Sequence, residues 1–187
     1  MKTFVLLLLG CVVFTGFAYA GPRVEMKTSL GTIQIELNAE KAPETVRNFL
    51  KYVDQKYYDG TIFHRVIEGF MIQGGGFDVN EKRKSTLTSI KNEADNGLKN
   101  IKGSVAMART GVVDSATSQF FINLVDNDFL NHRGRSAKKF GYAVFGQVTG
   151  GMDVVEKIGR IKTISKSPVF RNIPETAVIV EAVRRMD

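Results

Sequence analysis

The most chemically distinctive stretch of this sequence places a single cation among apolar side chains. Residues 63–75 read FHRVIEGFMIQGG, and Arg65 has aromatic and aliphatic neighbours on both sides. Glu68 and Gly69 predict a turn between two short strands. The guanidinium group of Arg65 is a rigid, planar set of donors, so it is the first candidate for a functional group. Residue type alone equally allows a strand-edge arginine that reaches water or pairs with an acid.

Other reactive side chains give little support to metal or nucleophilic chemistry. His64 and His132 are the only histidines, and they are far apart in the sequence. They make a poor metal site in a chain whose one cysteine, Cys11, lies near the start. Ser115 and Ser118 have no nearby His–Asp set of the kind that hydrolysis requires. We therefore expect no metal and no cofactor.

Three separate stretches resemble one protein family. They are residues 63–75, then SVAMAR at 104–109 followed by SQFFIN at 118–123, then DFL at 128–130 followed by YAVFGQV at 142–148. The three occur in the order found in the cyclophilin family of peptidyl-prolyl cis/trans isomerases. The resemblance runs from about residue 24 to the C-terminus, and it is greatest to the bacterial, exported branch of that family.

Composition is consistent with one globular domain. The 187 residues are 43% hydrophobic and 24% charged, which suits a chain with a sizeable core. The formal charge is +7, but no nucleic-acid-binding motif accompanies it. We expect a solvated basic surface and no nucleic-acid partner.

The first 20 residues predict a secretory signal peptide. Lys2 precedes a largely apolar run, and residues 18–20 form a small-x-small cleavage site that ends at Ala20. The run is too short and too poorly flanked for a membrane span. An alternative is a lipoprotein box that ends at Cys11 and would leave that residue lipidated. We expect cleavage after Ala20, a mature domain of residues 21–187 without any thiol, and a periplasmic or otherwise exported location.

Apolar periodicity predicts mostly short strands. Residues 24–29 and 32–37 alternate in polarity and predict a β-hairpin. Pro43 begins a predicted helix that ends near residue 55. Further strands are expected at residues 61–67, 70–73, 105–109, 119–125, 142–148 and 176–183, with a second helix at 152–158.

Many short strands with two helices favour a mainly β fold and an antiparallel barrel. The resemblance implies a closed eight-stranded antiparallel β-barrel capped by two α-helices. Residues 78–100 form a long polar connection, of the kind that serves as a functional wall or a packed surface loop. Residues 131–141 are expected to be an exposed basic loop.

The resemblance implies catalysis of rotation about the peptide bond that precedes proline. The barrier to that rotation is ~18–20 kcal/mol because the bond has partial double-bond character. By resemblance, Arg65 is the catalytic residue, with no nucleophile and no proton transfer. The resemblance assigns substrate binding to Phe70, Met71, Gln73, Ala108, Arg109, Gln119, Phe121, Phe129, Leu130 and Tyr142. Among these, Gln119 would orient Arg65 or bind the substrate, and Ala108 and Arg109 would hold an extended peptide through backbone groups.

Three positions depart from the pattern of many eukaryotic members. Phe129 stands where those members carry Trp, Tyr142 where they often have His, and Arg109 where Asn is common. An indole can donate a hydrogen bond to a cyclic-peptide drug and a phenyl ring cannot. We therefore expect weak or no binding of cyclosporin, with the isomerase activity retained.

Two other functions remain open at this point. A binding or holdase-type module would use the same groove for proline-containing polypeptides without turnover. A basic adhesin of the cell envelope would use residues 131–141 to bind anionic polymers. We expect the chain to act as a monomer on proline-containing polypeptides.

Overall fold

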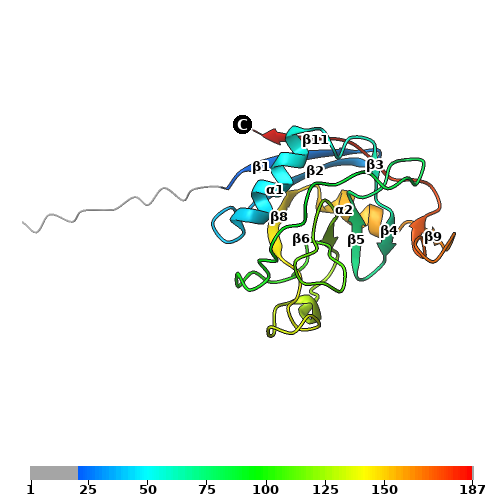
Figure 1. Cartoon of the computed structure of the whole chain (residues 1–187). Coiled ribbons are helices and arrows are strands. Elements are labelled where there is room, and N and C mark those ends of the chain that lie inside the picture. Colours follow the sequence, from blue (N-terminus) through cyan, green and yellow to red (C-terminus); the bar gives the residue numbers. More distant parts are fainter. Residues whose placement is uncertain (1–20, 187) are drawn as a thin grey trace, which may run out of the picture.

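The computed structural model describes residues 21–186, which form a mainly β structure with two α-helices (Figure 1). The helices are α1 (Pro43–Asp54) and α2 (Met152–Gly159), and one 3-10 turn, η1, spans Asp128–Leu130. The strands are β1 (Arg23–Thr28), β2 (Gly31–Leu37), β3 (Thr61–Ile62), β4 (Arg65–Ile67), β5 (Met71–Gly74), β6 (Ser104–Met107), β7 (Phe120–Asn123), β8 (Val144–Gly150), β9 (Thr163–Ile164), β10 (Ile173–Pro174) and β11 (Ile179–Met186). The predicted hairpin and both predicted helices are confirmed within one or two residues at each end.

Nine of the strands form one curled antiparallel sheet in the order β3-β11-β1-β2-β8-β6-β7-β5-β4. The expected closed eight-stranded barrel is not confirmed, because β3 and β4 stand at opposite ends of this order and do not pair. Only Phe63 and His64 separate these two strands in the chain, and they make no turn. Two consecutive extended segments cannot lie beside each other without a turn, so each pairs with a different partner instead. The small β9–β10 pair, which the sequence did not predict, forms a second sheet.

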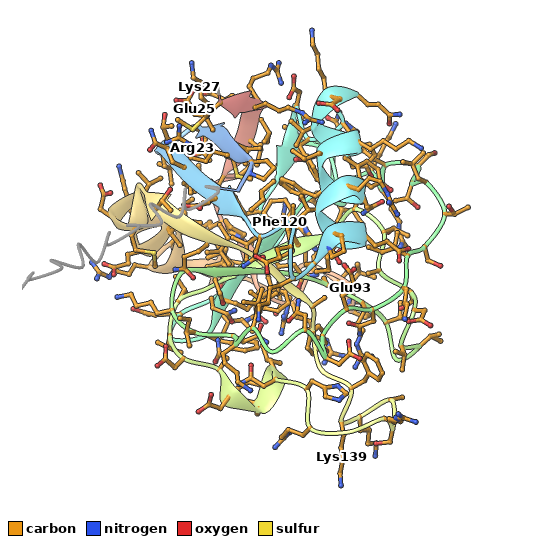
Figure 2. All side chains as sticks on the ribbon, turned by 90° about the vertical axis from the view of Figure 1, so that its left-hand side faces the viewer. Arg23, Glu25, Lys27, Glu93, Phe120 and Lys139 are labelled. Atoms are coloured by element: carbon orange, nitrogen blue, oxygen red, sulfur yellow. The ribbon has the colours of Figure 1, made fainter. Side chains whose placement is uncertain are left out.

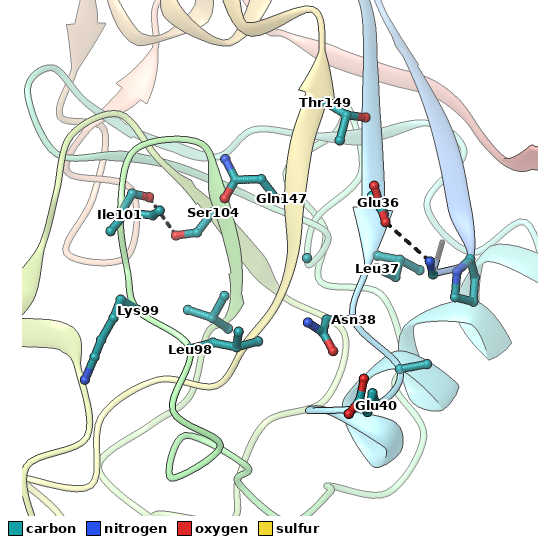
Figure 3. A pocket seen from close by; sticks show the side chains of 15 residues that line it. Glu36, Leu37, Asn38, Glu40, Leu98, Lys99, Ile101, Ser104, Gln147 and Thr149 are labelled. Atoms are coloured by element: carbon teal, nitrogen blue, oxygen red, sulfur yellow. Dashed lines mark hydrogen bonds between the residues drawn. The ribbon is translucent and has the colours of Figure 1, made fainter. Parts of the chain in front are cut away.

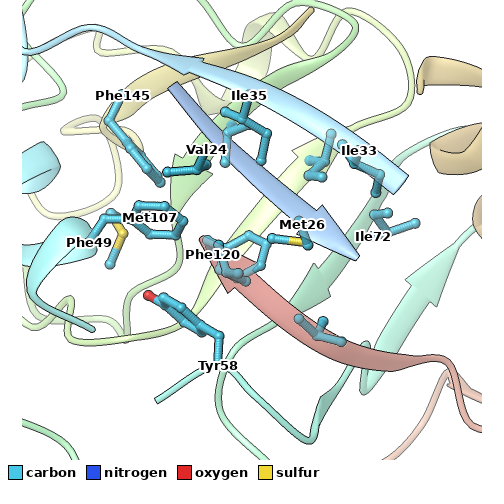
Figure 4. Close-up of a cluster of buried hydrophobic side chains, with 14 of the residues drawn as sticks. Val24, Met26, Ile33, Ile35, Phe49, Tyr58, Ile72, Met107, Phe120 and Phe145 are labelled. Carbon is cyan, nitrogen blue, oxygen red and sulfur yellow. The ribbon is translucent and has the colours of Figure 1, made fainter. Parts of the chain in front are cut away.

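The concave side of the sheet holds the main core, which α1 covers. Val24 and Met26 of β1 are fully buried, as are Ile33 and Ile35 of β2. Figure 4 shows these side chains gathered with Phe49 of α1 and with aromatic and aliphatic side chains of the other strands. Each fully buried apolar side chain of this size contributes about 1.5–3 kcal/mol relative to exposure.

The long connection at residues 78–100 packs against the start of α1. Ala42 at the N-cap offers no side-chain hydrogen bond. The carboxylate of Glu93 replaces it, accepting from the backbone N–H groups of Glu44 at 3.1 Å and Thr45 at 2.8 Å. Figure 2 shows Glu93 beside that end of α1. A negative charge there also complements the positive end of the helix dipole.

Some strands are buried on both faces, and this creates a second, smaller cluster outside the sheet. On β7, Phe120 belongs to the main core and its neighbour Phe121 to the outer cluster. Successive strand residues point to opposite faces, so continuous apolar runs require cover on both sides. The outer cluster consists of Met71, Ala106, Phe121, Leu130 and Val144.

No helix within residues 21–186 is both long and apolar enough to cross a bilayer. This finding does not extend to the predicted signal peptide, which lies outside the described residues.

His64 is a buried, neutral histidine at the connection between β3 and β4. Its side chain is 5% exposed, and its ring centroid lies 4.7 Å from that of Phe77. Nδ1 has no hydrogen-bond partner among the described residues. Burial lowers the pKa of His64 to about 4, and the nearby charge of Arg65 acts in the same direction.

His64 should make folding stability depend on pH in acid. Because the folded pKa of about 4 lies below the unfolded value of 6.5, the unfolded chain takes up the proton first and stability falls as pH drops from 6.5 towards 4. The contribution lost between pH 7 and pH 5 is about 2 kcal/mol. Urea unfolding of the wild type and of His64→Gln should show a flatter pH profile for the variant. His132→Gln, which removes the other histidine, is the control, and an equally steep profile in His64→Gln would contradict the assignment.

Candidate functional site

The site begins with one row of side chains that crosses the outer face of the sheet. Arg65 on β4 pairs with Gln73 on β5, Gln73 pairs with Phe121 on β7, and Phe121 pairs with Ala106 on β6. Residues opposite each other in a ladder share one face of the sheet. The register therefore puts a cation, an amide and an aromatic ring side by side.

The guanidinium group of Arg65 is half-buried, and its partners within the described part of the chain are neutral. Nη1 donates to Oε1 of Gln73 at 3.4 Å and lies 3.8 Å from the sulfur of Met71. The group also lies 5.9 Å from the centre of the Phe70 ring. Partial burial lowers the pKa of Arg65 from its ordinary value. No carboxylate within residues 21–186 forms an ion pair with it, so the pairing with an acid that the sequence left open is not observed.

A hollow of about 170 Å³ opens in front of this guanidinium. Most of the residues that the sequence assigned to substrate binding line it together with the predicted catalytic residue. The lining consists of Arg65, Phe70, Met71, Gln73, Ala108, Arg109, Phe121, Leu130 and Tyr142. The lining combines apolar side chains with the polar groups of Arg65, Gln73 and Arg109.

Gln119 and Phe129 lie beside the hollow rather than in its lining. Oε1 of Gln119 accepts from Nε2 of Gln73 at 2.9 Å, which leaves Oε1 of Gln73 directed towards Arg65. Of the two roles expected for Gln119, the geometry favours orientation of Arg65, through Gln73. The ring of Phe129 stacks on that of Phe70 with a centroid distance of 5.6 Å, and the residue is 58% exposed.

Arg109 has a structural task that the sequence did not indicate. Its Nε donates to the carbonyl of Gly141 at 2.9 Å, and its Nη2 donates to the carbonyl of Ala137 at 2.8 Å. The guanidinium group also lies 4.9 Å from the centre of the Tyr142 ring. Arg109 thus holds residues 131–141 against the rim of the hollow. These partners lie 28 and 32 residues further along the chain, so only the fold brings them together.

Backbone groups at residue 108 are less available than we expected. The N–H group of Ala108 donates to the carbonyl of Gln119 at 2.9 Å. It therefore already has a partner and does not stand free to bind a peptide.

A larger hollow of about 660 Å³ lies elsewhere, between β2, β8 and residues 98–101 (Figure 3). Carboxylates of Glu36 and Glu40 reach it, and Oε1 of Glu36 accepts from the backbone N–H of Gly21 at 3.3 Å. None of the residues expected to act in catalysis lines it. Volume alone does not make a site, and the converging polar groups around Arg65 favour the smaller hollow. Across residues 21–186, no three His, Cys, Asp or Glu side chains gather in a way that could hold a metal ion.

Comparison with known proteins identifies the family of this chain. The family model described as "Cyclophilin type peptidyl-prolyl cis-trans isomerase/CLD" matches residues 23–182. A peptidyl-prolyl cis-trans isomerase of Acinetobacter baylyi is 53% identical over 180 residues, covering 96% of this chain and 94% of the relative. Peptidyl-prolyl cis-trans isomerase B of Escherichia coli is 54% identical over 160 residues, covering 86% of this chain and 97% of the relative.

Solved structures give the same result. The crystal structure of a Cryptosporidium parvum cyclophilin-type isomerase matches with a TM-score of 0.72 and 25% identity, covering 89% of this chain and 98% of that one. A second crystal structure of that protein, in the presence of the dipeptide Ala-Pro, matches with the same TM-score and identity. The family model, these relatives and the fold agree: the chain belongs to the cyclophilin-type peptidyl-prolyl cis-trans isomerases and is an isomerase.

Proposed function

We propose that Arg65 catalyses rotation of Xaa-Pro bonds by donating a hydrogen bond to the prolyl nitrogen. In the planar amide that nitrogen shares its lone pair with the carbonyl, and in the twisted amide it regains the pair as an acceptor. A fixed donor aimed at the nitrogen therefore stabilises the transition state more than the ground state. The observation that carries this proposal is the half-buried guanidinium, which faces a hollow and has no carboxylate partner among the described residues.

The shape of the hollow supports proline as the bound residue. A volume of about 170 Å³ suits one small ring better than an extended drug-sized ligand, for which pockets usually exceed ~300 Å³. The side chains of Met71, Phe121 and Leu130 would contact the pyrrolidine ring. The amide of Gln73 would bind substrate backbone beside it, since an amide both donates and accepts.

A proline-binding module without turnover is the second candidate. The apolar side chains that line the hollow favour it, because binding of a proline ring needs only apolar contacts. This role would not require a cation at position 65.

Substitution of Arg65 separates the two candidates. Arg65→Ala should lower kcat/KM for a short Xaa-Pro peptide by at least about 100-fold, because a preorganised donor to the transition state is lost. Peptide affinity, measured by NMR titration, should change by no more than about threefold, since the apolar contacts remain. Arg65→Lys should be intermediate, because an ammonium group lacks the planar fork. Arg160→Ala, an exposed arginine after α2, is the control.

Unchanged turnover in Arg65→Ala would refute the catalytic role. A loss of affinity equal to the loss of kcat/KM would assign Arg65 to substrate binding rather than to the transition state. Retained affinity with no measurable turnover in the wild type would favour the binding module.

We further propose that the enzyme is exported, that residues 1–20 are a cleaved signal peptide, and that residues 21–187 act as a monomer on unfolded or extended segments of exported proteins. The location of Gly21 supports cleavage after Ala20. Cleavage after Ala20 would turn the backbone nitrogen of Gly21 into a free ammonium group. That nitrogen lies 3.3 Å from Oε1 of Glu36, so the ammonium group would face a carboxylate.

Expression of the full chain in a Gram-negative host tests the location. Intact mass of the protein released from the periplasm should correspond to a chain that starts at Gly21. Recovery in the membrane fraction with a lipid on Cys11 would favour the lipoprotein alternative, and an uncleaved cytoplasmic chain would contradict export.

Cyclosporin should bind weakly or not at all because Phe129 has no polar donor. Phe129→Trp should strengthen the binding by about threefold to tenfold, the usual net value of one added hydrogen bond. Phe170→Trp, which adds an indole outside the hollow, is the control. Fluorescence titration measures both, and tight binding by the wild type would show that the indole donor is not needed.

A further inference from the structure

The basic loop at residues 131–141 forms one rim of the proposed proline pocket. Leu130 and Tyr142, which precede and follow the loop, both line the hollow, and the N–H of Tyr142 donates to the carbonyl of Leu130 at 3.0 Å. The chain therefore leaves the pocket wall and returns to it at the same place. The segment holds four Lys or Arg residues and no Asp or Glu.

The four cations of this loop are exposed and lack acidic partners. They are Arg133, Arg135, Lys138 and Lys139. No carboxylate within the described range 21–186 lies within ion-pair distance of them. Arg184 and Arg185 on β11, by contrast, bind Asp59 and Asp54. Figure 2 shows Lys139 at the edge of the molecule, directed away from the sheet.

The loop is held in place rather than attached only at its ends. Arg109 donates to two of its carbonyl groups, at Ala137 and Gly141. Nη2 of Arg133 donates to the carbonyl of Phe129 at 3.1 Å, and the Phe129 ring stacks on Phe70 of the pocket lining. Arg133 therefore contacts a residue, Phe129, that itself packs on the wall of the hollow.

Two carboxylates lie near this rim and offset only part of its charge. The carboxylate of Asp128 accepts from the side chain of Asn131 at 3.0 Å, and that of Asp114 accepts from the backbone of Asn92 at 2.9 Å. Arg65 and Arg109 add two further positive charges inside the hollow. The six cations of the loop and the hollow outnumber these two carboxylates, so we infer a positive field over the groove, which extends about 8 Å into a solution of physiological ionic strength.

We propose that this rim selects proline-containing segments that carry acidic residues near the proline. The inference rests on the proposed function, because it names the substrates that the same groove prefers. A peptide held by its proline ring brings its neighbouring residues within reach of the long Arg and Lys side chains. Charge complementarity of this kind raises the association rate and discriminates against basic segments. The position of the cations at the pocket rim favours a peptide over a free anionic polymer, which would not need the pocket.

Matched peptides test the selection. Two peptides with the same Ala-Pro centre carry either Glu or Gln at the second and third positions on each side. At low salt the wild type should show kcat/KM about fivefold higher for the Glu peptide, and about 0.5 M NaCl should remove most of the difference. NMR titration of the same peptides gives the affinity ratio whether or not turnover is measured.

Charge reversal distinguishes the field from a structural effect. In a variant with Arg135→Glu, Lys138→Glu and Lys139→Glu, the ratio of kcat/KM for the Glu peptide to that for the Gln peptide should fall to one or below. The kcat/KM for a peptide with Lys at the same positions should rise. The control carries Lys41→Glu, Arg47→Glu and Lys56→Glu, which remove the same charge from exposed positions on and beside α1. It should keep the wild-type ratio.

Equal kcat/KM and equal affinity for the Glu and Gln peptides in the wild type would overturn the inference while leaving the isomerase function intact. Salt-sensitive binding of dextran sulfate that needs the loop, together with that equality, would indicate a polymer-binding surface instead. Loss of the ratio in the control variant as well would attribute the preference to overall charge and would also overturn the role of the loop. An absence of turnover with a retained affinity ratio would contradict the catalytic proposal and not the selection.

Discussion

The alternation of side chains along short strands is the constraint on which this site depends. Val66 and Ile72 point into the main core, so their neighbours Arg65 and Gln73 must point outwards. A slip of one residue would exchange the faces and bury the guanidinium among apolar side chains, at a cost of several kcal/mol. The core therefore fixes the position of the cation without contacting it. Packing on one face of the sheet is what makes chemistry possible on the other.

A half-buried cation also needs partners that do not remove its charge. Oε1 of Gln73 accepts a hydrogen bond from Arg65, and the sulfur of Met71 lies close to the same nitrogen. Neither group carries a negative charge. A carboxylate in their place would satisfy the guanidinium more strongly and compete with any acceptor that enters the hollow. Gln119 completes the arrangement, because its bond to Gln73 fixes which end of that amide faces the arginine. Neutral partners thus keep the donor available.

Sequence reasoning succeeded where the signal was local and failed where distant segments meet. Periodicity predicted the hairpin, α1 and α2, and the family resemblance brought together the residues that line the hollow. Neither the periodicity nor the resemblance could show that Glu93 caps α1 across 49 residues, or that Arg109 holds a loop about 30 residues away. The pairing of β3 and β4 with different partners was missed for the same reason, since the run at residues 61–67 reads as one continuous strand. Such contacts depend on three-dimensional placement, and a one-dimensional pattern does not record them.

The proposed reaction and the proposed selection of substrates use different parts of this fold. The row from Arg65 to Ala106 lies on paired strands, where backbone hydrogen bonds fix the position of each residue: β5, β6 and β7 have a strand on each side, and β4 pairs with β5. Residues 131–141 pair with no strand and are held by side-chain bonds to their carbonyl groups. A change of charge in the loop alters the field over the groove without shifting the register of the sheet. A change in the strands alters the position of the donor itself. Substrate preference can therefore vary along the loop while the geometry around the prolyl bond stays the same.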